Sequence, residues 1–293
     1  MRGTTMKTLL TCLCCAAALV MIGNTASATT FMSDSFSYAD GQLTDSEVGG
    51  NPGDNVSGGL WTGHSGETFE DNVDVIGGQA ELLNSGSEDV NRSAHPAGTI
   101  FAGAGDKWYY AAMVTVNDTR SDPNTESINN DYFMHFIDTG FGFRGRSYLS
   151  DPNAASATTF TFGLSATSGG QTVAWGSDFA FGTQHKIVVS YDFDSGATEM
   201  WVDPVDINST SIVDLNGAGA GTFVGALAMR QDYLGGTPNN QIMVDGVALG
   251  NDFDTVMMNA MNGSDIQIPE PTSLALVFAG LASLTAVRRS KRS

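Results

Sequence analysis

Basic residues are scarce in this sequence of 293 residues. Lysine and arginine together number 13, against 32 aspartates and glutamates, and the formal net charge is −19. Six of the basic residues lie at the two ends, which leaves seven against 31 acidic residues between positions 29 and 266. Because a body this acidic repels phosphate backbones, nucleic acid is not an expected partner.

Cysteine is absent after position 15, and the three that occur lie in a segment that is typical of a secretory signal. Residues 1–28 contain basic Arg2 and Lys7, an apolar run at 9–22, and the small residues Ala26 and Ala28. This pattern predicts cleavage by signal peptidase before Thr29, with a membrane anchor that is never cleaved as the alternative. The mature chain would then have no disulfide and no thiol nucleophile.

The C-terminal segment, 267–293, has three parts in order. Pro269, Glu270 and Pro271 come first, residues 272–287 are apolar, and a basic end with Arg288 and Arg289 closes the chain. A helix of about 16 residues spans about 24 Å, slightly less than a ~30 Å hydrocarbon core. The basic end would stay cytoplasmic, which predicts a C-terminal anchor in the inner membrane with the body outside.

The order of these three parts closely resembles the PEP-CTERM sorting signal of Gram-negative bacteria. The resemblance implies recognition by an exosortase, a membrane-embedded processing enzyme, and removal of the tail. It also implies a host that makes exopolysaccharide. The expected location is therefore a transient inner-membrane anchor, followed by the cell envelope or extracellular matrix. A plain tail anchor remains the alternative.

Residues 29–266 lack any long segment with helical periodicity and contain many short runs with strand character instead. Glycine-rich and Asp/Ser-rich turns separate these runs, and aspartate, which favours turns, outnumbers glutamate by 24 to 8. This pattern predicts one all-β domain, an antiparallel sandwich flanked by the signal helix and the C-terminal hydrophobic helix. The predicted strands include 107–117, which has apolar residues on both faces like a central strand, 132–138, 159–165, 185–192, 198–203, 223–229, 241–247 and 253–259.

Several stretches resemble the LamG-like group of concanavalin A-like jelly rolls. They are the opening from Asp34 to Leu43 with Gly58 to Trp61 after it, the paired runs 185–192 and 200–203, and the run 252–256. In the second stretch, Trp201 and Pro204 replace the tyrosine and glycine that are typical of the group. The resemblance implies a jelly-roll β-sandwich, a fold that carries lectins, glycan hydrolases and adhesion modules, so the fold does not determine the function.

Motifs of catalysis are missing. The sequence contains no G-x-S-x-G, no H-E-x-x-H, no phosphate-binding loop and no E-x-D-x-x-E strand of the kind that glycan hydrolases of this fold often carry. Two of the four histidines, His135 and His185, fall on predicted strands and are interpreted as structural. A non-enzymatic protein is therefore expected. A hydrolase whose two carboxylates come from separate strands remains an alternative.

Two tryptophans are the candidate saccharide contacts. Trp61 and Trp175 lie in glycine-rich surroundings, whereas the other two lie within predicted strands. Because exposed aromatic rings can stack on sugar rings, Trp61 and Trp175 are the best candidates for contact with extracellular polysaccharide. The favoured interpretation of both is nevertheless that they pack at the rim and close the end of the sandwich.

No cofactor is certain, but the acidic loops could hold Ca²⁺, which takes oxygen ligands. The densest acidic stretch runs from 117 to 131 and includes Asp122 and Asp131. Many concanavalin-like sandwiches hold calcium near their terminal strands, and by that resemblance Asp34 and Asp252 or Asp254 would contribute. An acidic surface without metal is the alternative. The sequence thus predicts an exported surface or matrix protein that contacts polysaccharide. A carbohydrate-active hydrolase and a ligand-free structural protein are its rivals.

Overall fold

A computed structural model of the chain describes most of the predicted body. The described residues are 29–44, 55–65, 72–83, 86–94, 105–123, 126–128, 131–138, 142–153, 158–167, 169–217, 224–231 and 240–262. The predicted signal segment and the predicted sorting segment, 267–293, lie outside these residues. Within the described part, no helix has the length and apolar character needed to span a membrane.

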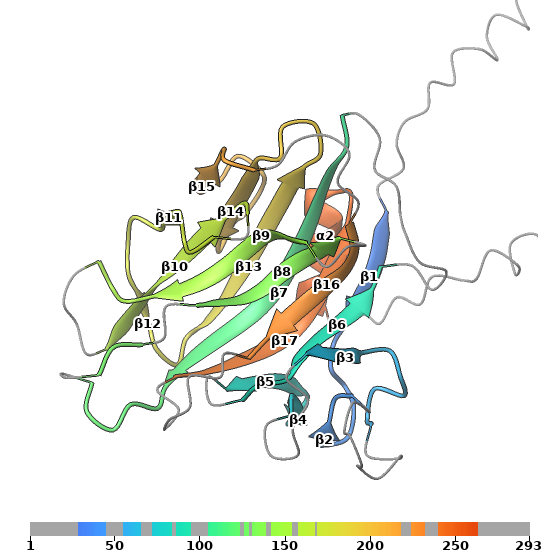
Figure 1. The fold of residues 1–293 in the computed structure, drawn as a ribbon, viewed down its shortest axis with the longest axis vertical. Helices are drawn as coiled ribbons and strands as arrows, with labels where there is room; N and C mark the ends of the chain where they lie inside the picture. The colour runs from blue at the N-terminus through green and yellow to red at the C-terminus, as the bar shows by residue number, and fades with distance from the viewer. Residues whose placement is uncertain are drawn as a thin grey trace, which may run out of the picture.

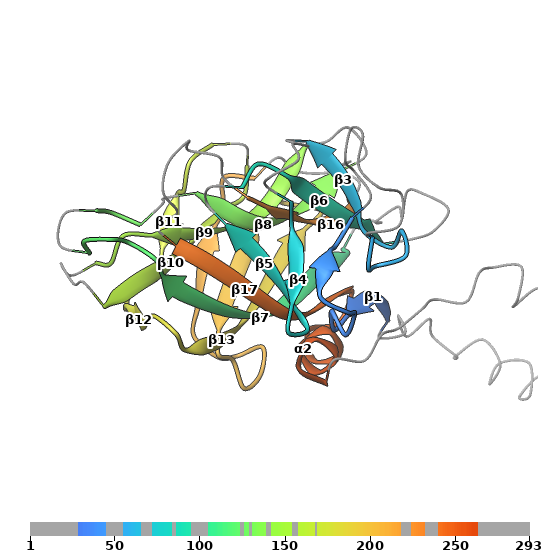
Figure 2. The same cartoon turned by 90° about the horizontal axis from the view of Figure 1, so that it is seen from below.

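The described strands form two antiparallel sheets that pack face to face (Figures 1 and 2). The nine-stranded sheet has the order β15-β14-β13-β7-β17-β5-β4-β2, with β1 also paired to β17. Its strands are β1 (Thr30–Asp34), β2 (Gly41–Gln42), β4 (Asp74–Ile76), β5 (Gln79–Leu83), β7 (Lys107–Asp118), β13 (Gln184–Asp192), β14 (Thr198–Val202), β15 (Ser211–Asp214) and β17 (Asn240–Gly250).

The eight-stranded sheet has the order β11-β10-β9-β8-β16-β6-β3, with β12 also paired to β10. Its strands are β3 (Thr62–Ser65), β6 (Asp89–Ser93), β8 (Tyr132–Asp138), β9 (Phe143–Ser150), β10 (Thr159–Ser165), β11 (Val173–Ala174), β12 (Phe179–Ala180) and β16 (Val224–Arg230). Both sheets combine hairpin neighbours with neighbours that are distant in sequence, such as β7 and β17 or β8 and β16, as in a jelly roll. The predicted antiparallel jelly-roll β-sandwich is confirmed.

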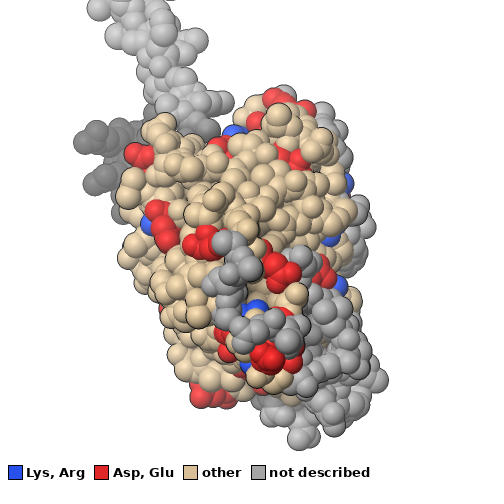
Figure 3. Space-filling view, turned by 90° about the vertical axis from the view of Figure 1, so that its left-hand side faces the viewer, with Lys and Arg blue, Asp and Glu red and all other residues tan. Residues whose placement is uncertain are grey.

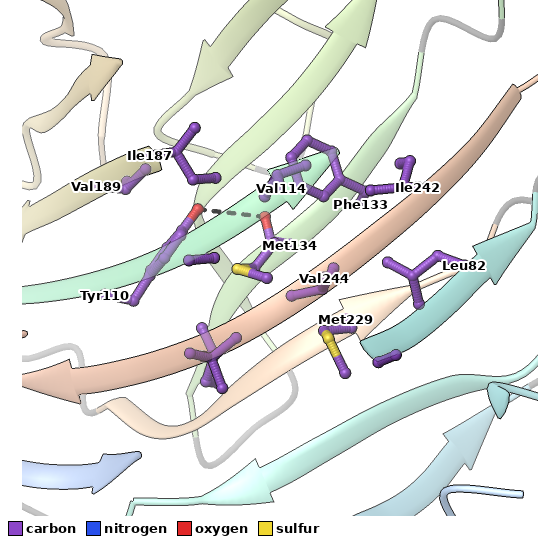
Figure 4. Packing of buried hydrophobic residues seen from close by; sticks show 14 of the residues in the cluster. Leu82, Tyr110, Val114, Phe133, Met134, Ile187, Val189, Met229, Ile242 and Val244 are labelled. Atoms are coloured by element: carbon purple, nitrogen blue, oxygen red, sulfur yellow. Dashed lines mark hydrogen bonds between the residues drawn. The ribbon is translucent and has the colours of Figure 1, made fainter. Parts of the chain in front are cut away.

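Local sequence patterns explain why these strand predictions succeed: β10 alternates apolar with small or polar residues, and β7 and β8 are apolar runs. β8 and β10 coincide with the predicted ranges, and β7 lies between β13 and β17 as a central strand should. In β10, Phe160, Phe162 and Leu164 all enter the core between the sheets. Side chains from both sheets meet there, and the Tyr110 hydroxyl donates to the Met134 carbonyl across the gap at 3.5 Å (Figure 4).

The predicted strand 253–259 is wrong, because this segment forms the helix α2 (Phe253–Asn262). Asp252 caps it, since its Oδ1 accepts a hydrogen bond from the Thr255 backbone N–H at 2.9 Å. The buried residues of α2 follow helical spacing: Phe253, Val256, Met257 and Ala260. They cover Tyr109, Ala111, Val188, Trp201 and Ala248 on the outer face of the nine-stranded sheet (Figure 2).

Gly246 makes this docking possible. It lies at a bulge in β17 with φ of +72°, where the pairing register with β7 shifts. A Cβ atom at this position would lie 2.2 Å from the carbonyl oxygen of Ala260, so only glycine lets α2 approach β17 this closely.

Candidate functional site

Trp61, one of the two predicted saccharide contacts, lies inside the sandwich. It is 1% exposed, its ring packs 5.7 Å from that of Phe36, and its indole N–H donates to Asp34 Oδ2 at 2.7 Å. The expectation of an exposed ring is thereby corrected. The physical reason is Asp34, a buried acceptor 27 residues earlier, which supplies the partner that a buried indole needs.

Trp175 is the second predicted contact, and it packs at the rim. It is 9% exposed, belongs to the main core cluster, and has its ring 6.2 Å from that of Phe179. Its backbone N–H donates a hydrogen bond to the Phe162 carbonyl at 2.8 Å, which fixes the residue against β10. Trp175 therefore packs as the rim-packing alternative has it, Trp61 lies deeper still, and neither leaves much ring surface for a sugar.

The five aspartates predicted as calcium ligands are not brought together. Among the described residues, no three His, Cys, Asp or Glu side chains gather as a metal ion would require. Asp34 is buried against Arg92, Asp252 caps α2, and Asp131 is paired with Arg230. Asp34, Asp252 and Asp131 do not fit a calcium site in this arrangement. Asp254 and Asp122 are exposed.

Another group of side chains does come together, on the outer face of the eight-stranded sheet. It is an arginine–tyrosine cluster centred on Tyr132 at the start of β8. The guanidinium carbon of Arg146, on β9, lies 4.5 Å from the Tyr132 ring centroid, and that of Arg230, on β16, lies 4.4 Å from it. Tyr148 and Phe143 of β9 complete it, with ring centroids 5.7 Å and 5.8 Å from that of Tyr132.

The two arginines of this cluster differ in their counter-ions. Arg230 Nη1 lies 2.5 Å from Asp131 Oδ2, and its Nε lies 3.8 Å from Asp89 Oδ2. Arg146 donates to the Tyr148 hydroxyl at 3.0 Å, and the structure places no carboxylate within ion-pair distance of it among the described residues. Carboxylates of the described residues therefore balance the charge of Arg230 but not that of Arg146.

A small pocket of about 20 Å³, open to solvent, lies beside the arginine–tyrosine cluster, where the ends of β5, β8, β16 and β17 meet between the sheets. It shares Asp131, Tyr132 and Arg230 with the surroundings of the cluster. Its polar wall also includes Gln231 and Asn240, and its apolar wall is formed by Leu82, Leu83, Phe133, Leu149 and Ile242.

Asn240 lines this pocket with an unused acceptor. The residue is 4% exposed, and its Oδ1 has no hydrogen-bond partner within the described part of the chain. Since buried polar atoms are nearly always hydrogen-bonded, this acceptor marks a position where a donor from outside the described residues, a water or a ligand hydroxyl, would be stabilised.

His135, next to the cluster, and His185, on the other sheet, are both buried and hydrogen-bonded, which agrees with their interpretation as structural. His135 is fully buried, and burial lowers its pKa to about 3, so it is neutral near pH 7. Its Nδ1 lies 3.0 Å from the Phe136 carbonyl and donates to it. His185 pairs through Nδ1 with Asp203 at 2.8 Å and packs against Phe179.

Asp89 is the most perturbed carboxylate near the cluster. Burial raises its pKa to about 6, although the hydrogen bond from Ser65 and the charge of Arg230 act in the opposite direction. The Ser65 hydroxyl donates to its Oδ2 at 2.7 Å, whereas its buried Oδ1 has no partner in the described structure.

This shift predicts how stability changes with pH. An unfolded aspartate has a pKa of about 3.9, so between pH 4 and pH 6 the folded state holds more of the Asp89 proton. The free energy of unfolding therefore falls as the pH rises through this window. Asp89→Asn lacks this titration, so we expect its free energy of unfolding to rise by about 2–3 kcal/mol relative to that of wild type between pH 4 and pH 7. Urea denaturation of both proteins at the two pH values measures this change. The same difference in unfolding free energy at pH 4 and at pH 7 would contradict the assignment.

Comparisons with known proteins find no family and only distantly similar solved structures. No family model matches the chain, and no curated protein matches it. Among solved structures, the Emp47p carbohydrate recognition domain is 11% identical with a TM-score of 0.41, covering 79% of this chain and 100% of its own. Basic winged bean lectin is 9% identical with a TM-score of 0.42, covering 65% and 92%. Alginate lyase A1-II′ is 8% identical with a TM-score of 0.40, covering 60% and 80%.

The arginine–tyrosine cluster could not be read from the sequence. Its three central residues come from three strands, and Arg230 is 84 positions after Arg146 in the chain. The strand that carries Arg146, β9, was not among the predicted strands. A signal was nonetheless present, because Tyr132 begins a predicted strand and the chain has few arginines outside its ends.

Proposed function

We propose that this chain is a non-enzymatic protein that contacts extracellular polysaccharide through the pocket and the arginine–tyrosine cluster. The observation that carries the proposal is the makeup of this region. It combines an aromatic ring, apolar side chains, charged groups and the orphan acceptor of Asn240. A sugar presents apolar C–H faces and hydroxyl donors together, and such a mixed wall complements both.

A screen of the full chain on a glycan array tests this proposal. We expect binding to a limited set of polysaccharide fragments, and weaker binding by Asn240→Ala than by wild type. Gln184→Ala is the matched control, because Gln184 is an exposed amide-bearing residue on β13 of the other sheet. Absence of binding to every glycan would contradict the proposal and favour the ligand-free structural protein.

A hydrolase is the second candidate, and one observation favours it. Asp89, with its raised pKa, and Asp131 lie on two sides of one arginine, and differing carboxylate environments are typical of glycosidases. However, Arg230 contacts both carboxylates, whereas a hydrolase needs the scissile bond between them. We therefore expect no release of reducing ends from any glycan that binds. Release that disappears in Asp89→Asn would establish the hydrolase.

We also propose that the chain is exported and then sorted by an exosortase. The proposal rests on the predicted signal cleavage after Ala28 and on Pro269, Glu270 and Pro271 before the apolar and basic end. Mass spectrometry of the protein from its native host is expected to find Thr29 as the N-terminus and to find no peptide containing residues 288–293. An intact C-terminus on the exported protein would leave the plain tail anchor.

Calcium binding remains a proposal that rests on the charge of the body, which Figure 3 illustrates by clusters of Asp and Glu with few Lys or Arg. A ligand of the folded state at a hundred times Kd stabilises it by about 2.7 kcal/mol, which is roughly 5–10 °C in Tm. Millimolar Ca²⁺ is expected to raise the Tm more than equal Mg²⁺ does, and Asp122→Ala is expected to abolish the excess. Equal shifts would indicate screening of the acidic surface without a specific site.

A further inference from the structure

Arg146 is a buried cation that has no counter-ion among the described residues. It is 5% exposed, and its Nε atom has no hydrogen-bond partner within the described part of the chain. The other arginines of the described residues each have a carboxylate oxygen 2.5–3.3 Å away: Arg92, Arg120, Arg144 and Arg230. In a chain with so many acidic residues, this exception shows that no carboxylate of the described protein occupies the place beside Arg146.

The surroundings of Arg146 compensate its charge only in part. The Tyr132 and Phe143 rings lie 4.5 Å and 5.6 Å from its guanidinium carbon, and the Tyr148 hydroxyl accepts one hydrogen bond from Nη1. The aromatic rings contact the guanidinium, but hydrogen bonds use its N–H groups, which point outward in the plane of the fork. A buried charge left in this state is costly, and an anion from outside the chain would remove the cost.

The neighbouring groups hold Arg146 ready for such an anion. The Tyr148 hydroxyl that accepts from Arg146 donates in turn to the Gly169 carbonyl at 2.7 Å, which ties the arginine to the loop after β10. Tyr132, which contacts Arg146, also lines the pocket. Since Arg230 is already neutralised by Asp131 and Asp89, a second anion entering here would find its charge partner at Arg146.

We propose that the polysaccharide bound by this chain is acidic and that Arg146 receives the carboxylate of a uronic acid unit. This inference rests on the proposed function and names its substrate class. The planar guanidinium fork matches a planar carboxylate in two parallel hydrogen bonds, and Tyr132 offers the sugar ring an adjacent apolar surface. Recognition is local, because the body as a whole carries an excess of acidic residues and repels a polyanion at long range.

Isothermal titration of the full chain with short uronate oligosaccharides tests this inference. The panel contains trisaccharides of galacturonate, glucuronate, mannuronate and guluronate, each as the free acid and as the neutral methyl ester of nearly the same shape. At least one acid is expected to bind at least tenfold more tightly than its ester. If no acid in the panel is preferred over its ester, or if a sulfated disaccharide is bound more tightly than every acid, the inference is overturned.

Variants of Arg146 assign the effect to this residue. Arg146→Met is expected to weaken binding of the free acid at least tenfold and to leave binding of the ester unchanged. Its Tm is expected to equal or exceed that of wild type, because an unpaired buried charge has been removed. Arg120→Gln is the matched control, since it removes one arginine that is paired with Asp118, outside the cluster. Unchanged binding of the acid by Arg146→Met would overturn the inference.

The proposed function and this inference can fail separately. Binding of neutral glycans on the array, together with no preference for any acid over its ester, would leave a polysaccharide-binding protein with a different substrate class. Absence of binding on the array and in the titration would overturn both.

Discussion

Asp34→Ala is expected to lower the free energy of unfolding by about 3–5 kcal/mol, because it leaves the buried charge of Arg92 without its partner. Asp34 Oδ2 accepts from Arg92 Nη1 at 2.5 Å, from the Trp61 indole N–H and from the Tyr38 hydroxyl, both at 2.7 Å. Its Oδ1 accepts from the Phe36 backbone N–H at 2.8 Å. One carboxylate thus joins the end of β1 to β6 and to the segment before β3, and urea denaturation measures its loss.

Two further variants make this expectation specific. The double variant Asp34→Ala, Arg92→Met is expected to lose less unfolding free energy than the two single variants lose in sum, because it leaves no unpaired charge. Asp254→Ala is the control for removal of an aspartate as such, since Asp254 is exposed in the first turn of α2. A loss below 1 kcal/mol for Asp34→Ala, or one equal to that of Asp254→Ala, would contradict the buried network.

Trp61→Ala is expected to destabilise the fold by about 3–5 kcal/mol, as the loss of a large core side chain does. If Trp61 were an exposed stacking platform, the same substitution would instead weaken glycan binding and leave the Tm nearly unchanged. Chemical denaturation and glycan binding of the variant distinguish the two. A large loss of binding at unchanged stability would restore the interpretation made from the sequence.

Trp61→Phe separates the two contributions of the side chain. It keeps an apolar ring beside Phe36 but removes the indole donor to Asp34. A hydrogen bond to a charged group contributes about 1.5–3 kcal/mol, so a loss of that size is expected. A loss as large as that of Trp61→Ala would show that packing of the ring contributes little.

The strands were predictable because their signal is local. In β10, the apolar residues at 160, 162 and 164 alternate with small or polar ones, and β8 is a short apolar run; both patterns are present in the sequence. The helix α2 was missed although its buried residues, Phe253, Val256, Met257 and Ala260, follow helical spacing. The run 252–256 resembles a terminal strand and so favours a strand over that spacing. The N-cap at Asp252, which favours a helix, is the competing signal.

The site was not predictable for the opposite reason. Burial of Trp61 depends on Asp34, and the environment of Arg146 depends on Tyr132 and Tyr148, which pair directly across β8 and β9. Such contacts are determined by strand order and register, which the alternation of residues within one strand does not contain. Glycine-rich surroundings suggested an exposed loop for Trp61. In the structure, the turn that contains Gly58 and Gly59 delivers the indole into the core.

The most direct test of the proposed site is one titration series with the uronate trisaccharide that wild type binds best. The account places the ligand at the arginine–tyrosine cluster and the adjoining pocket, and it places Trp61 in the core. Arg146→Met is therefore expected to bind at least tenfold more weakly than wild type, with a Tm no lower than that of wild type. Trp61→Phe is expected to have a lower Tm and, at temperatures where it is folded, the affinity of wild type. Wild-type affinity in Arg146→Met together with lost affinity in Trp61→Phe would contradict the account.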